Sequence, residues 1–322
     1  MSNFLVSFKV IGLGTLEIFL LGLTGFFLVQ RKMLGKVCIS TLSTLVINVT
    51  LPCLIFTSVV TRFSTEKYPS WWIYPICAIL LMCAASMFGL IITKFNKNLA
   101  EKREYISLFT FNNANYLPIP LIAAMFPKEQ AETYFVYVFL FLLGFIPFMA
   151  SFGVMLAAGK KFNKENIKDI FNPPLFAILS SLFIAYFGLT SYIPNILLNP
   201  MKLLGACTVP LAMIILGGII CLNFSNKLKI SPKIVIELAL VKLILLPLIA
   251  FFIVKNFPVN FRSLGFIIML QAAMPPATSL TAISEKFGGN SAFIGQVTFY
   301  IYIISLFTIP VMMGLYMYFV GL

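Results

Sequence analysis

The sequence predicts an all-α integral membrane protein with ten transmembrane helices. Its 322 residues are 60% apolar and only 10% charged, and the mean hydropathy is +1.00. A soluble domain contains about 25% charged residues, and a soluble fold of this size lacks the interior to bury so many apolar side chains. At about 20 apolar residues for each helical span, with short loops, the chain accommodates roughly ten crossings of the bilayer.

Ten apolar runs account for these crossings. They lie at about 10–30, 38–60, 70–93, 104–126, 133–158, 172–189, 201–222, 233–256, 263–284 and 291–320. The first run is expected to be a membrane span and not a cleaved signal peptide, because it is long, carries Glu17 and lacks a small-x-small cleavage site. The loops are short and polar, so we expect no soluble domain.

Basic residues are distributed unevenly between the two sets of loops. Fifteen lie in loops that follow the odd-numbered runs, seven lie on the other side, and Lys242 lies within the eighth run. The positive-inside rule places the richer loops in the cytoplasm and both termini outside it, in a cell (inner) membrane. The net charge of +13 therefore requires no nucleic acid partner.

Missing residue types exclude several kinds of enzyme site. The chain has no His, which removes His proton relays, His-ligated metals and Ser-His-Asp catalysis. Asp169 is the only aspartate, and no G-x-x-x-x-G-K-[ST] phosphate-binding loop occurs. The six cysteines form no C-x-x-C pair and are interpreted as core residues. We therefore expect no catalytic residue, no metal site and no cofactor.

Two pairs of prolines indicate an inverted internal repeat. Pro52 and Pro210 are 158 positions apart, and so are Pro118 and Pro276. The shift equals five runs, an odd number, so the second half is inverted relative to the first. Inverted repeats are typical of secondary transporters, which bind substrate near the midplane at broken helices. The predicted parts are a first repeat at 1–158, a short cytoplasmic linker at 159–171 and a second repeat at 172–322.

The fourth and ninth runs are expected to break into half-helices at mid-depth, because proline lacks an N–H and clashes with the preceding turn. One half-helix should begin near Asn115 with Pro118 in its first turn, and another near Met274 with Pro275 and Pro276 in its first turn. Both would present N-termini, which attract anions, to one point. The candidate substrate-binding residues at the breaks are Asn112, Asn113, Asn115, Pro118, Gln271, Pro275, Pro276, Thr278 and Ser279.

A simpler alternative is that these prolines only kink membrane helices and that the Asn side chains hydrogen-bond to neighbouring helices. The occurrence of two breaks at matching positions of inverted halves favours the substrate site.

Three further residues are candidates with open alternatives. Asn48 lies one helical turn before Pro52 and either lines the site or belongs to a kinked packing helix. Lys242 either attracts an anionic substrate, pairs with a carboxylate, or extends to the cytoplasmic interface. Glu17 is either a proton-coupling group or an interhelical partner.

Four motifs resemble the auxin efflux carrier family, which includes plant PIN carriers and prokaryotic carboxylate permeases. They are N-V-T-L-P-C-L-I-F at 48–56, N-x-N-Y-L-P-I-P-L at 113–121, V-K-L-I-L-L-P-L at 241–248 and M-P-P-A-T-S-L-T-A-I-S-E-K-F-G-G-N at 274–290. The resemblance covers nearly the whole chain, in order and at similar spacing.

The resemblance implies a ten-helix inverted repeat in which the broken fourth and ninth helices cross. Spans one, two, six and seven would form a scaffold that makes a homodimer, and the other six a transport domain that moves like an elevator. The family's carboxylate-binding Asn matches Asn113, with Asn115 nearby, and its helix-nine proline matches Pro275. Two departures are Pro118, where relatives often carry Gly, and the short loop at 159–171. The proline is expected to alter the pocket. The short loop differs from the long cytoplasmic loop of plant PIN carriers and favours a carboxylate carrier of the bacterial type over a carrier of auxin.

The leading prediction is therefore a membrane carrier of a small organic anion. A sodium-coupled carrier of the bile acid symporter type is the runner-up, although no Asp or Glu lies near either break. A non-transporting ligand sensor on the same fold and a membrane enzyme acting on lipid intermediates are less favoured.

Overall fold

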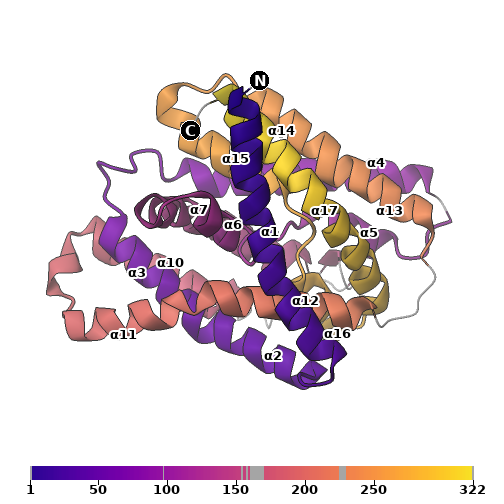
Figure 1. Ribbon diagram of the computed structural model, residues 1–322, viewed down its shortest axis with the longest axis horizontal. Coiled ribbons are helices and arrows are strands. Elements are labelled where there is room, and N and C mark those ends of the chain that lie inside the picture. The colour runs from indigo at the N-terminus through magenta and orange to yellow at the C-terminus, as the bar shows by residue number, and fades with distance from the viewer. Residues whose placement is uncertain are drawn as a thin grey trace.

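The computed structural model of the chain describes residues 2–96, 98–153, 155, 156, 159, 170–224 and 230–320. This part is almost entirely helical and contains no β-strand (Figure 1). Seven helical segments in it are long and apolar enough to cross a membrane, as the prediction of an all-α membrane protein requires. They are α1 (Ser2–Gln30), α2 with α3 (Lys36–Leu45, Leu51–Arg62), α4 (Ile73–Phe95), α7 (Lys128–Phe148), α11 with α12 (Asn195–Ala206, Thr208–Phe224), α13 with α14 (Pro232–Ala239, Leu246–Val254) and α17 (Ser291–Val320).

The other three predicted spans contain shorter helices. The sixth run holds α10 (Pro173–Tyr186). The fourth run holds the pair α5 (Lys102–Thr110) and α6 (Pro118–Met125), and the ninth run holds the pair α15 (Arg262–Ala273) and α16 (Ser279–Phe287). Each pair is interrupted at the polar, proline-containing stretch where the sequence predicts a break.

Two of the long segments change their helical geometry just before a proline. A π-helical turn at Val46–Thr50 joins α2 to α3, whose second residue is Pro52. A turn at Cys207 separates α11 from α12, whose third residue is Pro210. Proline removes a helical donor and its ring clashes with the preceding turn, which accounts for both interruptions.

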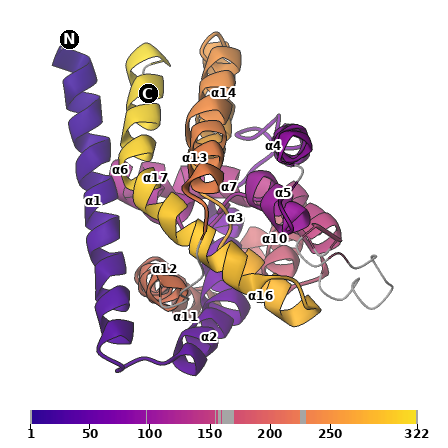
Figure 2. The same cartoon turned by 90° about the vertical axis from the view of Figure 1, so that its right-hand side faces the viewer.

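Helices α1 and α12 approach so closely that glycine is required at their contact. A Cβ atom on Gly25 would lie 1.9 Å from the carbonyl oxygen of Ile214, and one on Gly217 would lie 1.7 Å from that of Gly22. Small residues of this kind let membrane helices pack backbone against backbone. In Figure 2, α1 passes beside α12, which is seen nearly end-on. The two helices therefore form a closely packed pair.

The two ends of the described chain lie on the same side of the molecule. The start of α1 and the end of α17 are both near the upper edge in Figure 1 and in Figure 2. An even number of crossings brings the ends of a membrane protein to one face, and ten crossings would do so.

The interrupted stretches lie inside the protein. Residues 105–114 and 271–278 are buried throughout. Non-helical backbone at membrane depth is tolerated only where protein or water satisfies its hydrogen bonds, so the two stretches need internal partners.

Candidate binding site

The two interrupted runs cross each other and supply those partners, and we call this region the crossover. Asn112 and Pro276 form a single antiparallel β-bridge. The N–H of Asn113 donates to the carbonyl oxygen of Pro275 at 2.8 Å. Backbone groups of one extended connection thus satisfy those of the other, although 163 positions separate Asn113 from Pro276 in the sequence.

The prolines of the ninth run do not lie where the sequence suggested. We predicted Pro275 and Pro276 in the first turn of a helix beginning near Met274, but α16 begins at Ser279. This prediction was wrong because a proline disfavours the helical conformation at the residue before it, and Met274 is extended, with ψ 142°. The two prolines belong to the extended connection. Pro118, in contrast, is the first residue of α6, inside its first turn as predicted.

Asn112 and Gln271 hold the crossover together from within. The Nδ2 of Asn112 donates to the Oε1 of Gln271 at 2.5 Å, and the Nε2 of Gln271 donates to the carbonyl oxygen of Ala114 at 3.0 Å. Both side chains are buried. The amide of Gln271 therefore bridges the two broken runs.

Asn113 is hydrogen-bonded to a tyrosine that no sequence pattern singles out. Its Nδ2 donates to the hydroxyl oxygen of Tyr302 at 2.6 Å, and that hydroxyl donates to the carbonyl oxygen of Pro276 at 3.2 Å. Both side chains are buried. Tyr302 lies within the predominantly apolar α17, where no local motif distinguishes it, so only the three-dimensional structure shows its link to the crossover.

Asn115 differs from the other two asparagines because it is half-buried. Its Oδ1 accepts a hydrogen bond from the backbone N–H of the next residue, Tyr116, at 2.9 Å. The side-chain oxygen therefore bonds within its own segment and not to the other broken run. Among the described residues, no hydrogen bond engages its Nδ2. Asn115 is thus the asparagine whose amide nitrogen is available to a ligand.

A cavity of about 390 Å³ opens against the crossover, and we call it the crossover cavity. Facing the crossover are Ile47 and Leu51 of the α2–α3 segment and Asn172 at the start of α10, and side chains of α7 close another side. Its volume is typical of sites for small molecules. Five predicted site residues line it together: Asn112, Asn113, Asn115, Thr278 and Ser279.

The charge distribution around this cavity favours an anion. Among the described residues that line it, Lys286 is the only charged one. Thr278 and Ser279 form the start of α16, so the positive end of that helix dipole faces the cavity. The cavity thus combines positive electrostatics with amide and hydroxyl donors.

Lys242 lies at the crossover but not in the cavity. It is only 3% exposed, and its Nζ donates to the carbonyl oxygen of Phe109 at 2.5 Å. The interpretation that this side chain extends to the cytoplasmic interface is therefore wrong. Phe109 is the penultimate residue of α5, so the ammonium group lies at the negative end of that helix dipole.

Two other candidates lie outside the crossover cavity. Asn48 is exposed on the π-helical turn, and its neighbour Ile47 lines the cavity instead. Glu17 is exposed on α1. The structure does not bring either side chain together with the asparagines of the crossover.

Two further spaces lie near the crossover cavity, and their linings share residues with their neighbours. A space of about 10 Å³, here named the connecting space, shares Leu51, Asn115 and Tyr116 with the crossover cavity. A cavity of about 360 Å³, here named the α3–α7 cavity, shares Val209 with the connecting space and has Lys128 in its lining. The connecting space therefore shares lining residues with both of the large cavities.

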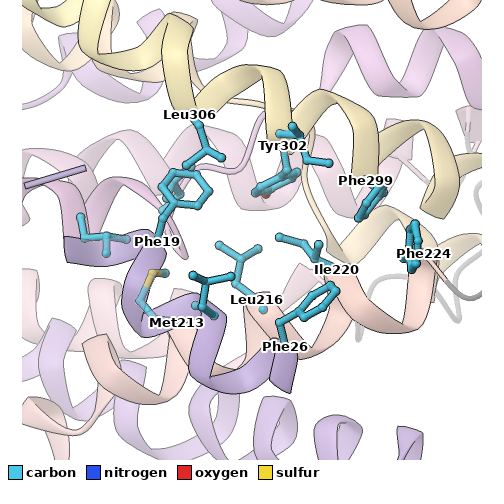
Figure 3. Close-up of a pocket in the computed structure, with 15 residues that line it drawn as sticks. Phe19, Phe26, Met213, Leu216, Ile220, Phe224, Phe299, Tyr302 and Leu306 are labelled. Atoms are coloured by element: carbon cyan, nitrogen blue, oxygen red, sulfur yellow. The ribbon is translucent and has the colours of Figure 1, made fainter. Parts of the chain in front are cut away.

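A separate cavity of about 290 Å³ lies between α1, α12 and α17 and is lined almost wholly by apolar side chains. Figure 3 shows Phe19, Met213 and Leu306 around it, one from each helix. Tyr302 also lines it, but its hydroxyl is engaged by the crossover. The described lining residues of this cavity include no charged group that could attract an anion, so the crossover cavity is the better candidate.

Two ion pairs connect the α2–α3 segment to other helices. At its start, Lys36 pairs with Glu285 of α16 at 2.6 Å, and both side chains are exposed. At its end, the partly buried Arg62 pairs with Glu132 of α7, with its Nε 2.8 Å from a carboxylate oxygen. These pairs attach the two ends of the α2–α3 segment to α16 and to α7.

No cluster of three or more His, Cys, Asp or Glu suited to a metal ion occurs in the described part of the chain. The described groups at and around the crossover that can interact with a ligand are amides, hydroxyls, helix ends and lysines.

Comparison with known proteins agrees with this architecture. The sequence profile described as "Membrane transport protein" matches residues 14–313. An uncharacterized transporter of Methanothermobacter thermautotrophicus is 27% identical over 306 residues, covering 92% of this chain and 95% of the relative.

Two further relatives match more weakly. An uncharacterized transporter of Methanocaldococcus jannaschii is 25% identical over 223 residues, which is 68% of each chain. The PIN-LIKES 1 protein of Arabidopsis thaliana is 25% identical over 178 residues, covering 49% of this chain and 36% of the relative. The chain belongs to the membrane transport protein family, the auxin efflux carrier and PIN-like family that its motifs resemble.

Proposed function

We propose that the protein is a secondary transporter that carries a small organic anion, a carboxylate, across the membrane. The observation that carries this proposal is the crossover cavity, where the half-buried Asn115, the start of α16 and Lys286 border one space without a carboxylate among the described lining residues. Family membership supports transport, and this geometry supports the charge of the substrate.

In the proposed complex, the carboxylate lies against the crossover. The Nδ2 of Asn115 donates to one carboxylate oxygen, while the hydroxyls of Thr278 and Ser279 and the dipole of α16 stabilise the negative charge. Asn113 positions the crossover through Tyr302 and borders the same cavity. Lys286, at the far end of α16, attracts the anion electrostatically.

We propose that the ten spans form an inverted repeat and that they divide into two groups of helices, which move relative to each other during transport. Helices α1–α3 and α10–α12 form the scaffold, and α4–α7 with α13–α17 form the transport domain. The crossover cavity fits this division because its lining comes from both groups. In an elevator-like displacement, the transport domain would slide along the scaffold. A substrate bound at the crossover would then move from the crossover cavity, past the connecting space, to the α3–α7 cavity.

The proposal extends to the cellular setting. We place the protein in the cell membrane as a homodimer that associates through the scaffold, with both termini outside the cytoplasm, since the basic loops fall on the opposite side. Proton coupling through Glu17 is a separate prediction, and an imposed pH gradient that leaves uptake unchanged would contradict it. Sodium coupling is less favoured, because the cavity lining described above includes no Asp or Glu.

A thermal-shift screen on detergent-purified protein tests the choice of substrate class. A ligand that binds the folded state stabilises it by mass action, so a carboxylate at 100 times its Kd adds about 2.7 kcal/mol to the free energy of unfolding. We expect one or more small carboxylates to raise the Tm, while the corresponding uncharged amides do not. Equal shifts with acids and amides would contradict recognition of an anion.

A further inference from the structure

The α3–α7 cavity lies between helices that the proposed movement displaces relative to each other. Helices α3 and α11 of the scaffold line one part of it, and α6 and α7 of the transport domain line another. Its volume of about 360 Å³ is close to that of the crossover cavity. The α3–α7 cavity can therefore accommodate the same small molecule.

Two basic residues line this cavity without an acidic partner. Lys128 is the first residue of α7, Lys202 lies in α11, and both side chains are exposed. Neither lysine forms an ion pair in the described part of the chain. The one acidic residue among the described lining residues, Glu132, is paired with Arg62 of α3. Because that pair carries no net charge, the cavity keeps the positive charge of the two lysines.

The two lysines belong to different walls of the cavity. Lys202 comes from the scaffold and Lys128 from the transport domain. Each ammonium group carries three donors on a flexible stem, so both can turn towards one anion in the space between them. Lys128 also begins a helix of 21 residues, whose positive dipole end adds to the attraction. The cavity thus offers two mobile cations and a helix end to a carboxylate.

We propose that the α3–α7 cavity is a second anion site, where the ammonium groups of Lys128 and Lys202 bind the carboxylate of the substrate. This inference rests on the proposed function and adds a site on the other side of the membrane. In the orientation proposed above, Lys128 and Lys202 lie outside the cytoplasm, whereas Lys286 of the crossover cavity lies on the cytoplasmic side. The second site then holds the anion on the outer side, before it reaches the crossover or after it leaves.

The test measures how fast each lysine reacts with an acetylating reagent that modifies amines and does not cross membranes. The full-length protein is held in phosphatidylcholine proteoliposomes, and mass spectrometry reads the modification at each residue. The probes are butyrate and succinate, with butyramide and chloride of equal ionic strength as controls. At least one carboxylate, at about ten times its Kd, should slow the reactions of Lys128 and Lys202 about tenfold, because the bound anion engages both amines. Lys67, an exposed lysine outside the cavity lining, should react at an unchanged rate.

Matched variants separate this site from the crossover and from the general surface charge. Lys202→Gln should raise the Kd about fourfold, so that the protection of Lys128 falls to between about threefold and fourfold at the same concentration. Lys202→Arg keeps the charge and should keep the protection, and so should Lys67→Gln, which removes a lysine outside the cavity. Asn115→Ala should leave Lys128 and Lys202 protected, because Asn115 does not line the α3–α7 cavity. A single peak in size-exclusion chromatography shows that each variant folds.

Three results would overturn the inference. Lys128 and Lys202 could react equally fast with and without either carboxylate, or butyramide or chloride could protect them as well as the carboxylates do. Protection by added phosphatidylglycerol but by neither carboxylate would assign both lysines to the membrane surface. A protein that neither binds nor takes up any carboxylate contradicts the proposed function itself, and that result is distinct from unprotected lysines in an active carrier.

Discussion

The Nζ of Lys242 lies 2.5 Å from the carbonyl oxygen of Phe109, at the point where α5 ends and the crossover begins. The last carbonyl groups of a helix have no partner within the helix, and a cation near them is favoured by the helix dipole. Lys242 comes from the π-helical turn Leu240–Leu245, between α13 and α14. This contact thus attaches the eighth span to the crossover.

Replacing this lysine should destabilise the protein without changing substrate affinity. In Lys242→Met the Phe109 carbonyl loses its partner inside the protein, at a cost of about 1–3 kcal/mol. We expect thermal unfolding in detergent to begin several degrees lower, and the KM of carboxylate uptake to stay within about twofold of the wild-type value. An unchanged Tm with a KM raised tenfold would assign Lys242 to the substrate instead.

The link between Asn113 and Tyr302 predicts strong coupling between two substitutions. Tyr302→Phe removes the hydroxyl that joins Asn113 to Pro276, and Asn113→Ala removes the other partner. Each should lower stability by about 1–3 kcal/mol, and the double variant should lose clearly less than the two losses combined. The measurement is the free energy of chemical unfolding of the wild-type protein, the two single variants and the double variant, from which the coupling energy follows. Additive losses would show that the two side chains act independently.

Lys286 should influence the capture of the anion and not the stability of the fold. The side chain is exposed, so its field is screened by salt. We expect Lys286→Gln to raise KM severalfold at low ionic strength and by a smaller factor at 0.5 M salt, while Lys286→Arg stays near wild type. The measurement is uptake at both salt concentrations. An unchanged KM in Lys286→Gln would contradict a role of Lys286 in attracting the substrate.

The two ion pairs at the ends of the α2–α3 segment should differ in strength. The exposed pair of Lys36 and Glu285 is expected to contribute less than about 0.5 kcal/mol, because solvent screens it. Loss of the partly buried Arg62–Glu132 pair should lower stability more, by about 1 kcal/mol. Lys36→Gln serves as the control for Arg62→Gln in thermal unfolding, and equal effects would contradict this ranking.

The positions of the two helix breaks could be read from the sequence, because proline and asparagine in an apolar run have few compatible structures. Pro118 lies in the first turn of α6 as predicted, and five of the predicted polar residues line one cavity. The placement of Pro275 and Pro276 failed because the prediction began the second half-helix at these prolines, whereas α16 begins at Ser279. Their extended backbone is stabilised by a connection more than 150 positions away, which no local pattern reveals.

The different roles of the three asparagines could not be predicted either. Asn112, Asn113 and Asn115 are equivalent by composition. Gln271 engages the side chain of the first and Tyr302 that of the second, whereas no described residue engages the amide nitrogen of the third, which lines the cavity. These assignments depend on which helices surround each side chain. Lys242 is a similar case, because its partner is a backbone carbonyl that carries no sequence signal.

Uptake of a radiolabelled carboxylate by proteoliposomes that contain the purified protein tests the central claim most directly. We predict saturable uptake that competing carboxylates inhibit, and that falls at least tenfold in Asn115→Ala while the protein remains folded. Binding without uptake would indicate a sensor and contradict transport. Saturable uptake that both Asn113→Ala and Asn115→Ala leave unchanged would contradict the assignment of the substrate to the crossover.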